Sequence, residues 1–310
     1  MTETNYEKYL VREPLWETGP GVKNRQSPTM TFMSSTQVPG VNYYIEFGWI
    51  YDIPDPNPHD HEHVHNFDEI VLHIGGDPDN PEDLGGEIEF YVGGQPLTLT
   101  TTNGIFIPAG VTHGPLIWKR FTRPHLEMAI MLGAGSSKLG WGESGIKESK
   151  KELPQKKDDI DYARYFVSKP IYEAASPEGP VKGRQNPTMT LMSTAQVPEA
   201  NYYAELGWIY NIPDPNPHIH EHVHKYDEIV LHWGGDPENP LDLGGEIEFY
   251  VGGQPLTFDT TTGLFVPAGL KHGPLTWKSV RRPHMEMALM LGTGDLKEGW
   301  GDSGIGGPKK

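Results

Sequence analysis

The chain has 310 residues, with 42 acidic and 25 basic side chains, a formal net charge of −17 and no cysteine. This acidity argues against nucleic acid and anionic membranes as partners, because both need basic patches on the protein. The lack of cysteine excludes disulfides, thiolate metal ligands and thiol nucleophiles.

Glycine and proline are both abundant, with 37 and 29 residues, which indicates many short strands joined by tight turns. The N-terminal residues 1–8 lack the apolar stretch of a signal peptide, and no segment approaches the ~18 apolar residues of a membrane helix. We therefore expect a cytoplasmic protein that contacts neither nucleic acid nor membrane. A homo-oligomer is compatible with the sequence.

The chain is an internal duplication. Residues 24–146 align with residues 183–305 without a gap at roughly 70% identity, so the two copies must share one fold. Residues 147–160 form a charged stretch of the kind that links domains. We expect two domains, residues 1–155 and 156–310.

Strands dominate each predicted domain. In the first copy, residues 42–51 are aromatic and β-branched, residues 87–92 and 97–101 flank a Gly-Gly turn, and residues 105–110 and 123–132 are further apolar strands. No amphipathic helix longer than about three turns is predicted outside the linker. The sequence therefore predicts an all-β fold, built twice as a barrel or sandwich.

A ladder of histidines at every second position lies between the first two strands of each copy. It comprises His59, His61, His63 and His65 in one copy, and His218, His220, His222 and His224 in the other. In an extended chain these side chains share one face, and a glutamate and a further histidine follow. Imidazoles with one carboxylate are typical of transition-metal sites. Parity alone leaves His61 with His63 open as the ligand pair.

The complete pattern, HxHxxxE followed about 40 residues later by PxGxxH, resembles the two motifs of the cupin superfamily. The resemblance covers the core of both copies and implies a bicupin, with two tandem cupin-type jelly-roll β-barrels. It implies one divalent transition metal per barrel, with Fe or Mn favoured and Ni, Cu or Zn as alternatives. The ligands that it implies are His63, His65, Glu69, His113, His222, His224, Glu228 and His272.

Other side chains near these motifs are weaker candidates. His61, His220, Glu127 and Glu286 are candidates for acid–base catalysis, and His73, His232, Arg123 and Arg282 are candidates for substrate binding. For the two arginines, a surface salt bridge is the competing interpretation. The motif positions Asn57, Asn216, Ile117 and Thr276 depart from the residues usual in cupins, which leaves the substrate undetermined.

The resemblance leads us to expect an oxidoreductase of dioxygenase type that acts on a small, oxygen-rich, anionic or enolisable molecule. One alternative is a decarboxylase, isomerase or lyase in which the metal is a Lewis acid. A second alternative is a non-catalytic module that binds metal or sugar, and a closed structural zinc site is also compatible with the ligands.

Overall fold

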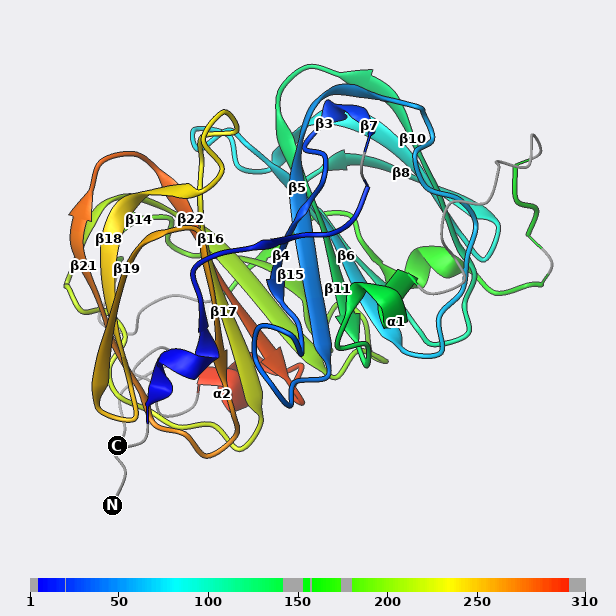
Figure 1. Cartoon of the computed structure of the whole chain (residues 1–310). Helices are drawn as coiled ribbons and strands as arrows, with labels where there is room; N and C mark the ends of the chain where they lie inside the picture. The colour runs from blue at the N-terminus through cyan, green and yellow to red at the C-terminus, as the bar shows by residue number, and fades with distance from the viewer. Residues whose placement is uncertain (1–4, 20, 142–152, 157, 174–179, 301–310) are drawn as a thin grey trace. The chain divides into compact units, whose positions relative to one another are not determined.

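The computed structural model describes residues 5–19, 21–141, 153–156, 158–173 and 180–300 (Figure 1). The chain forms two compact units. We call Pro14–Lys169 the first barrel, and Met1–Glu13 with Pro170–Lys310 the second barrel. These units differ from the division at residue 155 expected from the sequence, because each barrel includes the short segment that precedes the other repeat.

The first barrel contains strands, one short α-helix and one 3-10 helix. They are β2 (Leu15–Trp16), β3 (Lys23–Arg25), β4 (Met30–Met33), β5 (Tyr43–Asp55), β6 (Asp68–Gly75), β7 (Asp83–Val92), β8 (Gln95–Thr101), β9 (Asn103–Ile107), β10 (His113–Phe121), β11 (His125–Leu132), α1 (Ser137–Trp141), η3 (Tyr162–Tyr165) and β12 (Phe166–Val167).

The second barrel repeats this order. Its elements are η1 (Tyr6–Tyr9), β1 (Leu10–Val11), β13 (Ile171–Tyr172), β14 (Lys182–Arg184), β15 (Met189–Met192), β16 (Tyr202–Asp214), β17 (Asp227–Gly234), β18 (Asp242–Val251), β19 (Gln254–Thr260), β20 (Thr262–Val266), β21 (His272–Val280), β22 (His284–Leu291) and α2 (Leu296–Trp300).

Each barrel combines an eight-stranded and a three-stranded antiparallel sheet. In the first barrel the larger sheet runs β12-β9-β6-β11-β5-β4-β2, with β3 paired to β5, and the smaller sheet runs β10-β7-β8. The all-β prediction is confirmed, and a strand lies at each of the five predicted positions in the first copy. Both strand neighbours of β11 come from the larger sheet, so β11 lies near its centre.

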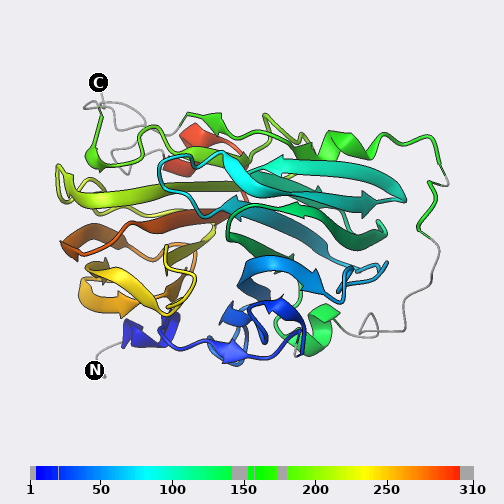
Figure 2. The ribbon, with the colours of Figure 1, turned by 90° about the horizontal axis from the view of Figure 1, so that it is seen from above.

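The segment preceding each repeat packs onto the other repeat's strands. β1 pairs with β20 and β12 pairs with β9, and Figures 1 and 2 show the N-terminal segment beside strands of the second barrel. The β7–β8 turn accommodates this arrangement at Gly93, where a Cβ atom would lie 2.1 Å from the Tyr162 ring. Gly93 also has φ of +56°, a conformation that favours glycine.

The core of each barrel lies between its two sheets. In the first barrel it includes Trp118, Phe90 and Ile88, which are at most 2% exposed, and Tyr162 from η3. Apolar side chains of this size stabilise the fold by about 1.5–3 kcal/mol each when fully buried. Among the described residues, no helix has the length and apolar character needed to span a membrane.

The histidine ladder differs from the expected strand. Residues 56–67 form no regular strand, and only His63 takes part in a β-bridge, with His113. The alternation nevertheless survives, because Glu62 and Val64 are exposed whereas His65 is buried. Extended local backbone is therefore sufficient to direct alternate histidines inward, without a continuous strand ladder.

Candidate metal centres and the adjoining cavity

Each barrel gathers three histidines and one glutamate. The donor atoms of His63, His65, Glu69 and His113 all lie within 4.8 Å of one another, and those of His222, His224, Glu228 and His272 do the same. The cluster contains His65 and not His61, so the structure brings together the set that the cupin resemblance implied.

Backbone hydrogen bonds hold the ladder against the strand that carries the third histidine. His63 N donates to His113 O at 2.8 Å, and His113 N donates to His63 O at 2.9 Å. Gly110 N, in the turn before His113, donates to His65 O at 2.8 Å. His222 and His272 form the same reciprocal pair in the second barrel. Two motifs that lie far apart in sequence are thereby locked into one site.

The imidazoles are oriented so that Nε2 faces the centre of each cluster. His63, His113, His222 and His272 each place Nδ1 between 2.6 and 3.0 Å from the backbone carbonyl two residues earlier. This contact fixes the tautomer with a proton on Nδ1 and leaves Nε2 as a lone-pair donor.

The donor atoms themselves are buried without hydrogen-bond partners. This holds for Nε2 of all six clustered histidines and for Oε2 of Glu69 and Glu228. Only the 2.9 Å contacts of His113 with Glu69 and of His272 with Glu228 offset this burial, so the converging donor atoms would be costly to the fold unless something binds them. Three imidazole nitrogens with one carboxylate oxygen suit a divalent transition metal, so the residues present fit such an ion.

Electrostatics in the cluster keep most of the imidazoles neutral. Burial lowers the pKa of His63 to about 3 and that of His222 to about 4. Burial also disfavours protonated His113, but the Glu69 carboxylate, 2.9 Å away, outweighs it and raises the pKa of His113. Without metal, the Glu69–His113 pair therefore holds a proton that metal binding must displace.

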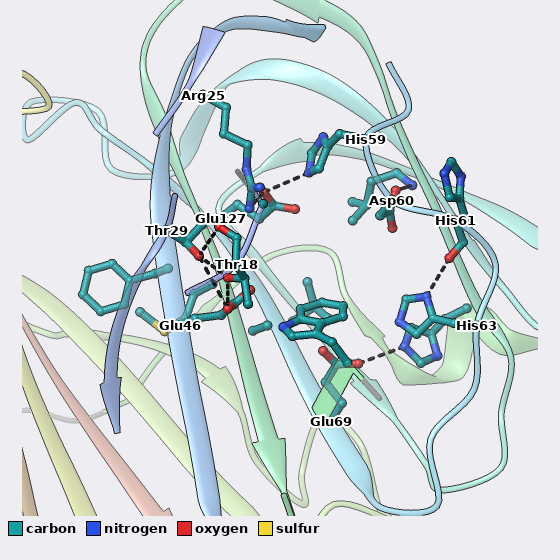
Figure 3. Close-up of a pocket in the computed structure, with 18 of the residues that line it drawn as sticks. Thr18, Arg25, Thr29, Glu46, His59, Asp60, His61, His63, Glu69 and Glu127 are labelled. Carbon is teal, nitrogen blue, oxygen red and sulfur yellow. Dashed lines mark hydrogen bonds and ion pairs between the residues drawn. The ribbon is translucent and has the colours of Figure 1, made fainter. Parts of the chain in front are cut away.

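A cavity of about 230 Å³ adjoins the first cluster (Figure 3). His63, Glu69 and His113 line it, and so does Trp141 at the end of α1, whose ring centroid lies 5.7 Å from that of His63. Apolar wall comes from Phe47, Val71, Phe90 and Leu116. A cavity below the ~300 Å³ typical of drug-sized ligands fits a small metabolite.

A buried ion pair lies on the cavity wall away from the clustered imidazoles (Figure 3). Arg25 Nη2 lies 3.2 Å and His59 Nε2 lies 3.5 Å from Glu127 Oε2, and all three side chains are at most 11% exposed. Burial alone would raise the pKa of Glu127, but the Arg25 and His59 neighbours lower it well below its usual range. Glu127 is therefore ionised.

Two further carboxyl groups line the cavity. Burial raises the pKa of Asp60 to about 6, while its Oδ1 accepts a hydrogen bond from Leu116 N at 2.6 Å. Burial also raises the pKa of Glu46, whose Oε2 accepts hydrogen bonds from Thr18 and Tyr44. Asp60 can therefore carry a proton near pH 6, and burial favours the protonated form of Glu46.

The second cluster adjoins much less space. Its cavity is about 20 Å³, room for about one water molecule. Ile219, 6% exposed, occupies the position equivalent to Asp60, and Trp300 Nε1 donates to Glu205 Oε2 at 3.0 Å across the site. Lys271, beside the ligand His272, turns outward and pairs with Glu221.

No protein-family model and no curated protein matches the sequence of this chain. Solved structures do match its fold. Vicilin from Corylus avellana has a TM-score of 0.55 at 9% identity, covering 92% of this chain and 86% of that one. The formate complex of Lactobacillus farciminis oxalate decarboxylase has a TM-score of 0.55 at 10% identity, and the match covers 98% of this chain and 92% of that one. A point mutant of Bacillus subtilis oxalate decarboxylase has a TM-score of 0.52 at 9% identity, and the match covers 91% of this chain and 80% of that one.

The chain has the bicupin fold. At these identities the likeness establishes the fold and not the activity. It confirms the fold class that the two histidine motifs implied.

The remaining sequence candidates of the bicupin lie in different places. Glu127 lines the first cavity, and its counterpart Glu286 lines the second beside Arg184. His61 lines the first cavity, and its backbone carbonyl orients His63. His220 is exposed. His73 and His232 are buried, and they pair across strands with Glu127 and Glu286, respectively.

The two arginine candidates form surface salt bridges instead of lining a cavity. Arg123 pairs with Asp77 and Asp83, and Arg282 pairs with Asp236 and Asp242. Their side chains are about half exposed. The two arginines therefore fit the surface salt bridge that was the alternative to substrate binding.

Sequence reasoning missed Arg25, Glu46 and the role of Asp60 at the cavity. Arg25 and Glu46 recur as Arg184 and Glu205. Glu46 lies between Ile45 and Phe47 in a predicted strand, and a charged residue kept between apolar neighbours was the available signal. Arg25 lies between Asn24 and Gln26 and carried no such signal.

The two His/Glu clusters differ at one supporting residue. Tyr226 Oη lies 3.1 Å from His224 Nδ1 and donates to Gly299 O at 2.7 Å, whereas Phe67 stacks on His65 in the first barrel. We expect Tyr226→Phe to weaken metal binding at the second site by about 10-fold, because partners of the distal imidazole nitrogen hold the ligand in place. Chelator competition measures this affinity.

The first site provides the internal control for this substitution, because its metal affinity should be unchanged in Tyr226→Phe. Each site can be followed alone in a background that lacks the other's glutamate ligand. Equal affinity of the second site in wild type and Tyr226→Phe would show that the hydroxyl does not support His224.

Proposed function

We propose that the first barrel is a metal-dependent enzyme that cleaves a carbon–carbon bond in a small carboxylate and releases CO2. The observation that carries this proposal is the 230 Å³ cavity, whose lining includes three residues of the donor cluster, His63, Glu69 and His113, and the protonatable Asp60. Two of the fold neighbours named above are oxalate decarboxylases, which supports the decarboxylase alternative better than the dioxygenase expectation.

We propose manganese as the metal, one ion per barrel. The ligands His63, His65, Glu69 and His113 would hold the first ion, and His222, His224, Glu228 and His272 the second. One structure of the Bacillus subtilis oxalate decarboxylase is described by its Mn(II) centres, which favours Mn over Fe among the metals that suit this donor set. When bound, the ion supplies a Lewis acid that draws electron density from a substrate oxygen.

The chain's own residues do the remaining chemistry. The apolar wall formed by Phe47, Phe90 and Leu116 limits water around the substrate. When the carbon–carbon bond breaks, CO2 leaves, and the electron pair of that bond stays on the carbon that remains. The protonated carboxyl group of Asp60 gives its proton to that carbon and is reprotonated from solvent.

We propose that the second barrel has a structural role. Its metal cluster has the same donors, but its cavity of about 20 Å³ leaves no room for an organic substrate. Ile219 also removes the proposed acid from this barrel.

Asp60→Asn tests the reaction. We expect it to lower turnover by about 100-fold or more, because general acids typically contribute 10²–10⁴-fold. In the wild type, turnover should fall as pH rises through about 6, where Asp60 loses its proton, and the variant should lose this limb. CO2 release and O2 uptake are measured together over a panel of small carboxylates.

Asp79→Asn, which changes an exposed loop carboxylate in the same barrel, is the matched control and should keep full turnover. O2 uptake in stoichiometric proportion to product would instead support the oxidoreductase hypothesis. Absence of CO2 release from every carboxylate would reject the proposed reaction.

A further inference from the structure

The first cavity carries an unusual excess of carboxylates. Its lining includes Glu17 at the rim and Glu46, Asp60, Glu69 and Glu127 within. Among the described lining residues, Arg25 is the only lysine or arginine. With one divalent ion held at Glu69, three positive charges in total would face five carboxyl groups.

The charge of Arg25 is already neutralised. Its Nη2 lies 3.2 Å from Glu127 Oε2, and the two side chains are 8% and 11% exposed. In so little water, transferring Arg25 to a substrate carboxylate would leave the buried Glu127 carboxylate with His59 alone, at 3.5 Å, which is unfavourable. Among the described lining residues, no lysine or arginine is therefore left to pair with a second anionic group.

Proton uptake by the carboxyl groups does not remove this excess of negative charge. Burial raises the pKa of Asp60 and Glu46, so these two can lose their charge first. Glu127 keeps its charge, because the pKa of Glu127 is lowered by Arg25 and His59 despite burial. The wall away from the metal donors stays rich in hydrogen-bond acceptors.

The metal end has the opposite character. A divalent ion with one carboxylate and neutral imidazoles retains a net charge of about +1, which suits a single carboxylate of the substrate. We infer that the substrate is a monocarboxylate with an ammonium or hydroxyl group at its other end, and that dicarboxylates are rejected. This inference rests on the proposed metal-dependent reaction and specifies its substrate class.

Matched ligands of one length test the inference. Binding to the manganese-loaded protein is measured by calorimetry for γ-aminobutyrate, γ-hydroxybutyrate, butyrate and succinate, and for β-alanine, β-hydroxypropionate, propionate and malonate. In at least one series we expect the amino and hydroxy acids to bind about 10-fold or more tighter than the dicarboxylate, because like charges in a desolvated site repel.

Glu127→Gln should reduce this preference by about 10-fold, because it removes the fixed charge that repels the second carboxylate. Glu286→Gln, the same change beside Arg184 in the second barrel, is the matched control and should leave the preference unchanged. If Glu127→Gln fails to fold, Asp60→Asn replaces it at a pH above about 6, where Asp60 is ionised. Asp60 has no ion pair to break, and its substitution should also narrow the preference there.

Equal or tighter binding of the dicarboxylates, or no binding of any ligand, would overturn the inference. So would an unchanged preference in Glu127→Gln and Asp60→Asn. CO2 release is scored separately: the binding order without CO2 release rejects the proposed reaction alone, whereas CO2 release from tightly bound dicarboxylates rejects the inference alone.

Discussion

Glu69→Ala is expected to lower turnover by about 100-fold or more, because it removes a ligand of the ion whose charge stabilisation contributes several kcal/mol. Glu228→Ala is expected to leave turnover within about twofold, since loss of a remote ligand need not change transition-state stabilisation in the first cavity. The physical basis is the difference between cavities of about 230 Å³ and 20 Å³ beside matching donor sets. Steady-state kinetics on the carboxylate with the highest CO2 release measures both effects.

Metal analysis of the same variants is the control. The wild type should hold about two ions per chain, and each variant should keep about one, because each barrel carries a full donor set. Equal loss of turnover in the two variants would contradict the division of roles between the barrels. A wild-type content near one ion would show that one cluster is not a metal site.

The donor clusters could be predicted because local chain geometry almost determines them. Alternation directs His63 and His65 inward even though residues 56–67 are not a strand, since it needs only extended backbone. The duplication supported a metal site in each copy, because the same spacing occurs twice. His61, which has the same parity, was separated from the ligands only by the family pattern.

The wall away from the ligands could not be predicted, because it depends on pairing between distant strands. Arg25 on β3 pairs with Ile50 along one edge of β5. Glu127 on β11 pairs with Gly48 along the other edge of β5. Nothing in the spacing of these residues indicates that register. Arg123 shows the converse, since its place beside the histidine motif suggested a site but its nearest carboxylates lie on the surface.

The unequal cavities were equally inaccessible from sequence. The change from Asp60 to Ile219 is visible in the alignment of the two copies, but the cavity of about 20 Å³ depends on the whole lining around Ile219. Volume is a property of the assembled wall, so a single substitution indicates its direction at most.

Metal removal is expected to lower the melting temperature strongly at pH 7.5 and much less at pH 5. An ion at 1,000 times its dissociation constant stabilises the fold by about 4 kcal/mol per site. In the metal-free protein, the pKa of His113 is raised by Glu69 and that of His272 by Glu228. Each held proton must leave, so affinity falls about tenfold per pH unit below that pKa, or about 1.4 kcal/mol per site.

The sign follows from linkage. Metal binding depresses the pKa of these imidazoles below the unfolded value of about 6.5, so the stabilisation is present above that pH and is lost as pH falls. His63 and His222 compete little above pH 5, because burial already lowers the pKa of His63 to about 3 and that of His222 to about 4. Calorimetry with and without chelator at both pH values measures the gap in melting temperature between metal-loaded and metal-free protein. The double variant Glu69→Ala/Glu228→Ala should show almost no gap. A gap that is unchanged or larger at pH 5 would mean that the clustered histidines do not bind the metal.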